Sequence, residues 1–209
     1  NLIDINVADV NLALCIQETM DNNGFSNVNQ ITSLNCGNRN ISDITGIEQL
    51  TSLTLLNLDD HSTNSTLVDI TSLQTMTQLT DLSLWGVPVE SATPLAGLTN
   101  LTRLVFTDAT FSDVTPLANL IQLEELWLQN MFNVTDISSL SVLTNITMFV
   151  GNNSINITNW SLIGQWTKLT NLIFFNNGAS DLSFIQTLTL LESLQLGYGD
   201  DLSDISFLQ

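Results

Sequence analysis

A hydrophobic pattern of the form Leu-x-x-Leu-x-Leu returns along almost the whole chain at nearly constant spacing. The central positions of its eight copies are Leu34, Leu56, Leu82, Leu104, Leu126, Phe149, Leu172 and Leu194. Successive copies are 22 or 23 residues apart, with a single longer step of 26 residues between Leu56 and Leu82. A unit this short cannot bury its own hydrophobic face, so such units stack on one another and share a core. The pattern therefore predicts a solenoid of about eight repeats.

Each repeat has two parts that the sequence distinguishes. The alternating Leu-x-Leu segment favours a strand with its leucines directed inward and the residues between them directed outward. A polar residue that can cap a short helical turn follows each strand. These residues are Asp43, Asp69, Ser91, Asp113, Asp136, Asn159, Asp181 and Asp204. Pro94 and Pro116 occupy one slot just after this position, which is tolerated early in a turn. We expect each repeat to contain one parallel strand and one short 3₁₀ or helical turn.

Two segments match a known consensus closely. Residues 99–102 read T-N-L-T, and residues 113–120 read D-V-T-P-L-A-N-L. In these segments the chain resembles the internalin-like, short-repeat class of bacterial leucine-rich-repeat proteins. The resemblance implies an α/β solenoid, a leucine-rich-repeat horseshoe with a parallel concave β-sheet, short 3₁₀ or helical convex turns and an N-terminal helical cap. It also implies a secreted or cell-surface bacterial protein that binds through its concave sheet.

One position departs from that family. The asparagine that usually follows the Leu-x-Leu segment is retained only at residue 177, and other residues take its slot. These are Arg39, His61, Val87, Ala109, Met131 and Ser154. Because this asparagine normally satisfies backbone groups of the coil, we expect irregular or partly strained loops on this rim.

Residues 1–30 do not repeat and are predicted to cap the solenoid formed by residues 31–209, whose last repeat is truncated. Leu12, Cys15, Ile16 and Met20 share one helical face, with Asp9 before it and Gly24 after it. Cys36 occupies a core position of the first strand. A disulfide between Cys15 and Cys36 would join the cap to the first coil, as suits a secreted protein. The alternative is a pair of buried free thiols. No capping sequence follows the last repeat, so we expect the native protein to continue beyond residue 209.

The composition excludes several functions. The chain has 21 acidic residues against Arg39, Arg103 and Lys168, which gives a formal net charge of -18. So few cations cannot neutralise a phosphate backbone, so no nucleic acid is expected as a partner. An anionic membrane would repel the chain, and no apolar run approaches the length of a membrane span, so direct membrane insertion is not expected. With one histidine and no phosphate-binding or cofactor motif, the sequence predicts neither an enzyme nor a cofactor.

Two acidic clusters are candidates for metal sites. His61 lies beside Asp59 and Asp60 in the longest rim loop, and a second cluster comprises Asp200, Asp201 and Asp204. Neither follows a recognised ligand spacing. We interpret the first as a solvated loop, and Asp204 as a capping residue. No metal site is predicted, although calcium binding by the acidic clusters stays open.

The outward positions of the strands are polar at both ends of the solenoid and apolar in its middle. The candidate ligand-binding residues of this concave face are Trp85, Arg103, Val105, Trp127, Gln129, Met148, Val150, Ile173 and Phe175. We expect the apolar members to be open to water, and contiguous exposed apolar patches usually mark interaction sites. For Val105, Val150 and Ile173 the alternative is the ordinary preference of strands for β-branched residues.

Three functions fit this pattern. The first is a secreted or surface-attached recognition and adhesion module that binds a protein or peptide through its concave face. The second is a carbohydrate-binding adhesin, because tryptophan beside Asn, Asp or Gln also suits stacking on a glycan. The third is a structural spacer of a larger surface protein, whose apolar face contacts a neighbouring domain or copy.

Overall fold

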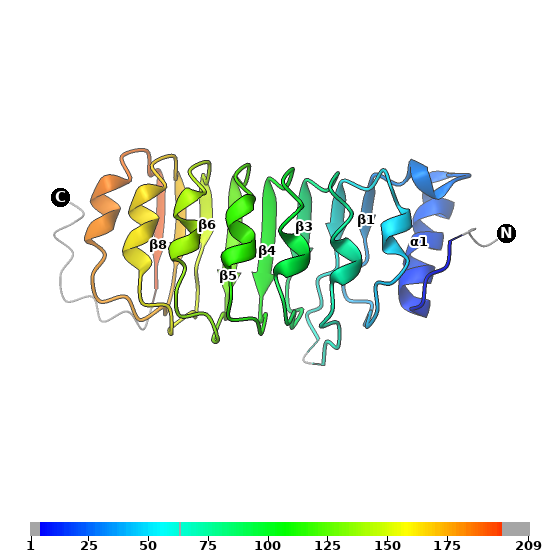
Figure 1. The fold of residues 1–209 in the computed structure, drawn as a ribbon, viewed down its shortest axis with the longest axis horizontal. Coiled ribbons are helices and arrows are strands. Elements are labelled where there is room, and N and C mark those ends of the chain that lie inside the picture. The colour runs from blue at the N-terminus through cyan, green and yellow to red at the C-terminus, as the bar shows by residue number, and fades with distance from the viewer. Residues whose placement is uncertain (1–4, 63, 198–209) are drawn as a thin grey trace.

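The computed structural model describes residues 5–62 and 64–197 and shows a single eight-stranded parallel sheet with strand order β1 to β8. Each strand pairs with the next one along the chain, and the central leucine of one strand faces the central residue of the next. The strands are β1 (Ser33–Asn35), β2 (Leu55–Asn57), β3 (Asp81–Leu84), β4 (Arg103–Thr107), β5 (Glu125–Gln129), β6 (Met148–Val150), β7 (Asn171–Phe174) and β8 (Ser193–Leu196). The predicted leucine-rich-repeat solenoid is confirmed (Figure 1).

Short 3₁₀ helices form a second layer that runs parallel to the sheet (Figure 1). They are η1 (Val28–Gln30), η2 (Ile47–Gln49), η3 (Thr71–Leu73), η4 (Thr93–Leu95), η5 (Thr115–Asn119), η6 (Ser138–Val142), η7 (Trp160–Gln165) and η8 (Ser183–Thr187). Pro94 and Pro116 lie in the first two positions of η4 and η5, where no backbone N–H is required. No helix in the described parts of the chain is long and apolar enough to cross a membrane.

The core fills the space between the two layers. The central residues of the first seven strands are buried, and those of neighbouring coils stack on one another. Towards the C-terminal end aromatic rings enlarge this core, and Trp166 packs edge-on against Phe149. Trp160 and Trp166 are buried, and their indole N–H groups donate to the carbonyls of Asn177 and Leu140. The continuous core therefore fixes the strands and leaves only their outward side chains for other tasks.

The rim that follows the strands is regular, and the expectation of irregular loops is wrong for most coils. The residue four positions after the strand centre adopts a left-handed conformation in six coils: Asn38, Gly86, Asp108, Asn130, Asn153 and Asn176. Asparagine, aspartate and glycine tolerate this conformation, so the turns carry little strain. Most residues of the altered asparagine slot point into the core, and the hydroxyl of Ser154 there accepts from the Met131 amide.

The helix α1 (Val10–Asn23) covers the β1 end of the solenoid. Its apolar face buries Leu12, Cys15 and Ile16 as predicted, and Asp9 caps its N-terminus by accepting from two backbone amides. Cys15 is joined to Cys36 of the first coil, so the predicted disulfide is confirmed. The segment that precedes the helix passes close to Gly46, where any side chain would overlap the Asn6 carbonyl. Helix, disulfide and backbone contact together tie the cap to the first coil.

Candidate functional site

The outward side chains of the middle strands form an aromatic cluster on the concave face. Trp85 follows β3 and Trp127 lies in β5, and their rings meet edge to face with centroids 5.6 Å apart. The His61 ring, from the loop after β2, lies 5.9 Å from the Trp85 ring. Side chains from three coils therefore make one continuous half-exposed surface, which we call the tryptophan cluster (Trp85, Trp127 and His61).

Two of the predicted contact residues are not available at this surface. Val105 and Val150 are only 1% and 2% exposed, which corrects the expectation that they are open to water. Both lie outside the main core and are covered by larger neighbours on the sheet face itself. Trp127 pairs in register with Val105 on one side and Val150 on the other, and Ile173 pairs with Val150 from the far side. Trp127 thus has a packing role in addition to any binding role.

Arg103 is held by two carboxylates. Its guanidinium is 3.0 Å from Asp81 on β3 and 3.1 Å from Glu125 on β5, and it lies 6.0 Å from the centre of the Trp127 ring. Partial burial lowers the pKa of Arg103, but the two carboxylates outweigh this effect and raise the pKa above its ordinary range. Arg103 is therefore a neutralised part of the face and not a free cation for an acidic ligand.

The remaining predicted residues continue the face towards β8. Gln129, Met148, Ile173 and Phe175 are all half-buried. The Phe175 ring rests against Gly197, where a Cβ atom would overlap it. Sequence reasoning omitted Leu55 on β2, which is 43% exposed. The repeat pattern could have identified Leu55 as outward-facing, because it occupies the same register position as Asp81 and Arg103.

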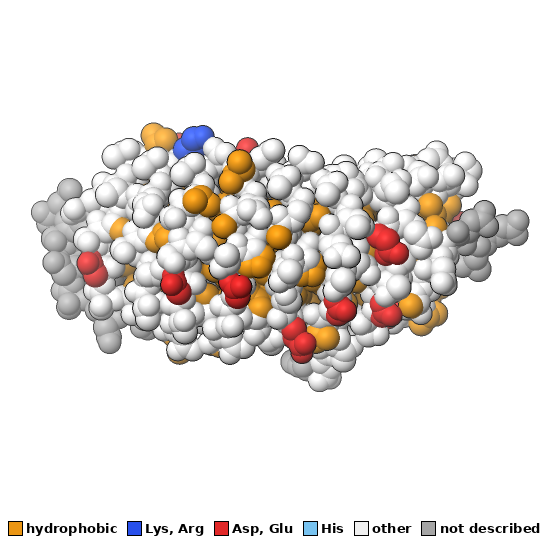
Figure 2. Space-filling view, in the orientation of Figure 1, with side chains coloured by type: hydrophobic (Ala, Val, Ile, Leu, Met, Phe, Trp, Pro, Cys, Tyr) orange, Lys and Arg blue, Asp and Glu red, His pale blue; other side chains and the backbone are white. Residues whose placement is uncertain are grey.

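The row of capping residues has a structural role. The Oδ1 atom of Asp69 accepts from the Thr71 amide at 2.8 Å, and Asp113 and Thr115 repeat this contact at the same distance. Hydrogen bonds from the hydroxyl and amide of the following Thr or Ser lower the pKa of Asp69, Asp113, Asp136 and Asp181. Acidic side chains are spaced along the face that carries the 3₁₀ helices (Figure 2).

One member of this row behaves differently. Asn159 does not cap its own turn, which corrects the prediction. Its Oδ1 accepts from the Ile137 amide of the preceding coil, and its Nδ2 donates to Asp136. Asp204 lies outside the described residues.

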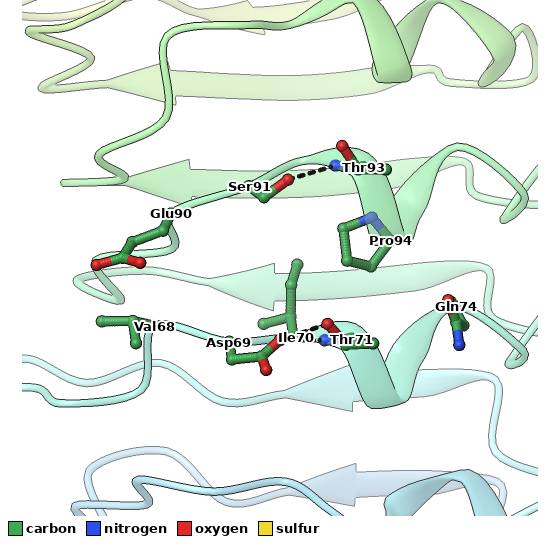
Figure 3. A pocket seen from close by; sticks show the side chains of 9 residues that line it. All are labelled: Val68, Asp69, Ile70, Thr71, Gln74, Glu90, Ser91, Thr93 and Pro94. Atoms are coloured by element: carbon green, nitrogen blue, oxygen red, sulfur yellow. Dashed lines mark hydrogen bonds between the residues drawn. The ribbon is translucent and has the colours of Figure 1, made fainter.

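A groove of about 460 Å³ lies between η3 and η4 on the same face (Figure 3). Several of its polar groups are already hydrogen-bonded within the turns. Asp69 accepts from the amide and hydroxyl of Thr71, and Ser91 accepts from the Thr93 amide. The groove follows from the turn geometry and offers few free polar groups.

In the first of the two acidic clusters, Asp59 has a structural role. Asp59 accepts from the Ser83 hydroxyl and the Trp85 amide, so it anchors the rim loop to the concave face. Over residues 5–62 and 64–197, no group of three His, Cys, Asp or Glu side chains could hold a metal ion. Asp200, Asp201 and Asp204 lie outside the described residues.

Comparisons with known proteins agree with this architecture. No protein-family model matches the chain, and no curated protein matches it. Among solved structures, internalin C2 of Listeria monocytogenes is 30% identical, with a TM-score of 0.83 over 97% of this chain and 89% of that one. An internalin (InlF) of the same species is 25% identical, with a TM-score of 0.47 over 96% of this chain and 78% of that one. The parallel sheet, the helical cap, the row of 3₁₀ turns and the identity to internalin C2 show that the chain belongs to the internalin family of leucine-rich-repeat proteins.

Proposed function

We propose that the chain is an extracellular recognition module that binds a protein or peptide through its concave face, and that it is not an enzyme. The observation that carries this proposal is the tryptophan cluster, in which large rings from separate coils meet on one face. Tryptophan is enriched among residues that dominate binding energy. The disulfide suits an oxidising compartment.

Two further features support a protein partner. The indole N–H of Trp127 has no acceptor among the described residues, and a buried donor without a partner costs free energy. Because this group is shielded from water, a peptide carbonyl would reach it only as the side chains over it move aside, and would then remove that cost. The two indoles are inclined at 66°, so they do not form the flat platform on which a sugar ring stacks well. A protein or peptide is therefore favoured over a glycan.

The test measures how tightly a captured partner binds the parent protein and two variants. The immobilised domain is exposed to an extracellular extract, and the captured protein is then titrated against Trp85→Ala and Trp127→Ala. Loss of an anchor costs at least about 2 kcal/mol, roughly thirtyfold in affinity. Phe132→Ala is the matched control, because Phe132 is an exposed aromatic residue in the loop after β5 and not on the strand face. Equal binding by both tryptophan variants would place the site elsewhere, and binding to a glycan array instead would favour the adhesin alternative.

A further inference from the structure

A cavity of about 510 Å³ adjoins the tryptophan cluster at the rim. Its lining combines the Trp85 ring and His61 with carboxylates and hydroxyl groups from three coils. The residues that line it are Asp60, His61, Ser62, Ser65, Trp85, Gly86, Pro88 and Asp108. Gly86 permits its shape, since any side chain there would overlap the Asp60 carbonyl. The cavity is therefore built by the long loop after β2 packing on the turn after β3.

Asp60 places an incompletely satisfied charge in the wall of this cavity. Its side chain is only 5% exposed, and its Oδ1 accepts from the Ser62 amide at 2.9 Å. Its Oδ2 is shielded from water and has no hydrogen-bond partner among the described residues. Burial raises the pKa of Asp60, but hydrogen bonds from Ser62 and Ser65 and the nearby His61 outweigh burial and lower it, so the group is ionised at neutral pH. A buried carboxylate of this kind is stabilised by a nearby cation.

No lysine or arginine of the chain supplies that cation, and the only basic side chain in the lining is the His61 imidazole. Arg39 pairs with Glu18, Arg103 pairs with Asp81 and Glu125, and the ammonium of Lys168 donates to Asn145. These three are the only Lys and Arg residues in the sequence. Asp108, the second carboxylate of the cavity, is exposed, and its Oδ1 accepts only an uncharged amide from Asn130. The cavity therefore has two carboxylates and no Lys or Arg.

The same face shows what such an arrangement can hold. Arg103 lies between the carboxylates of Asp81 and Glu125 and near the Trp127 ring. The cavity repeats this set of groups with Asp60, Asp108 and Trp85, but without the guanidinium. A planar guanidinium suits this set, because it binds carboxylates and also stacks on aromatic rings. A metal ion suits it less well, because no group of three potential ligands forms in the described parts of the chain.

We propose that the cavity lined by Asp60, Asp108 and Trp85 receives an arginine side chain of the protein partner. This inference rests on the proposed function, and it specifies which side chain enters beside the tryptophan cluster. Asp108 and the Trp85 ring contact the guanidinium directly. Asp60 acts from beneath as a fixed charge in poorly solvated surroundings, where Coulomb attraction is strong.

The test needs no natural partner. N-acetyl-arginine methylamide is titrated into the 15N-labelled protein, and the four tryptophan indole N–H signals are followed by NMR. Trp85→Phe assigns the signal of interest. We expect a saturable shift of the Trp85 signal with a Kd on the order of millimolar, as befits one isolated side chain. The citrulline counterpart, which has the same shape and no charge, should cause no saturable shift.

Charge-removing variants complete the experiment. Asp108→Asn retains the acceptor for Asn130 and should weaken binding of the arginine probe about tenfold, the effect of about 1.4 kcal/mol. Glu90→Gln removes one charge outside this cavity and should leave the Kd unchanged. Equal shifts with citrulline, or full binding by Asp108→Asn, would overturn the proposal. Asp60→Asn should also weaken binding, but Asp108→Asn decides the question if that variant does not fold.

The two proposals fail in different ways. If the arginine probe does not bind while Trp127→Ala still loses the partner, the concave face binds and the cavity does not take arginine. If the probe binds while Trp127→Ala retains the partner, the cavity is an arginine site and the concave recognition proposal is wrong.

Discussion

At the residue scale, the inward or outward direction of a side chain could be predicted from the sequence, but its exposure could not. Val105 was correctly placed on the outward register, yet it is buried beside the large Trp127 ring of the next strand. Asn159 occupies the capping slot, yet its amide bonds to the preceding coil instead of its own turn. In both cases the outcome depends on the size and chemistry of side chains one coil away, which a single-repeat pattern does not contain.

The disulfide should contribute substantially to stability. Cys15 and Cys36 are 21 residues apart, and closing a loop of this length in the unfolded chain contributes about 3 kcal/mol. Cys36→Ser should therefore lower the free energy of unfolding by about that amount, measured by urea denaturation. Cys15→Ser and the reduced parent protein should show similar losses. An unchanged midpoint in all three would show that the link does not stabilise the fold.

The capping row predicts a dependence of stability on pH. The pKa values of Asp69, Asp113, Asp136 and Asp181 are lowered in the folded protein. Their ionised forms thus stabilise the fold above the ordinary carboxyl pKa of about 3.9, and this contribution is lost as the pH falls through the folded values.

Thermal unfolding between pH 7 and pH 3 measures this effect. High salt should be present throughout, because it screens the repulsion among the 21 acidic residues that protonation would otherwise relieve. The variant with Asn at all four positions keeps the acceptor oxygens without titrating, so its acid loss should be smaller. Identical acid profiles for parent and variant would assign the loss to other groups.

At the element scale, the strands and the turns could be predicted because the same pattern recurs in each repeat. The left-handed backbone conformation of the rim residues was not predicted. Its signal was present as Asn, Asp or Gly four residues after most strand centres. The asparagine slot of the family, on which the prediction of irregular loops rested, lies one residue later in the chain. The side chains of this row also bond from coil to coil, since Asn153 donates to Asn130 and Asn176 donates to Asn153. A row of side-chain hydrogen bonds thus runs along the rim beside the concave face.

The conformation at Asn130 can be tested with a pair of variants. Its φ of 55° disfavours alanine by about 1–2 kcal/mol, whereas glycine adopts it freely. Asn130→Ala and Asn130→Gly both lose the bonds to Asp108 and Asn153. Asn130→Ala should therefore unfold more easily than Asn130→Gly by about 1 kcal/mol, and equal midpoints would exclude a role for backbone conformation.

Neighbouring positions of β5 separate core packing from face packing. Leu126 is completely buried, so Leu126→Ala should cost about 2–5 kcal/mol of unfolding free energy through the cavity it leaves. Trp127→Ala uncovers Val105 and Val150 but leaves the main core intact, so a smaller loss of about 1–2 kcal/mol is expected. Chemical denaturation measures both. A loss for Trp127→Ala as large as that for Leu126→Ala would mean that the tryptophan mainly supports the fold.

At the scale of the whole molecule, the repeat spacing was sufficient to predict the architecture, because stacked coils contact only their neighbours. The cap was predictable for the same reason, since Leu12, Cys15 and Ile16 form an apolar face that must cover the first coil. The cavity beside Trp85 was not predictable. It is formed by a loop that departs from the repeat, and its shape depends on how Asp60 packs against Gly86.

Charge and apolar surface together predict the state of association of the isolated domain. Two copies meeting through their concave faces would bury the tryptophan cluster but would also bring together two chains of formal net charge -18. This repulsion acts over roughly 8 Å at physiological ionic strength and over about 3 Å in 1 M salt. Light scattering should therefore give the mass of one chain at physiological salt, as a recognition module with a foreign partner requires. A dimer that forms at physiological salt and disappears in Trp85→Ala would instead support the spacer alternative, in which the apolar face contacts a neighbouring copy.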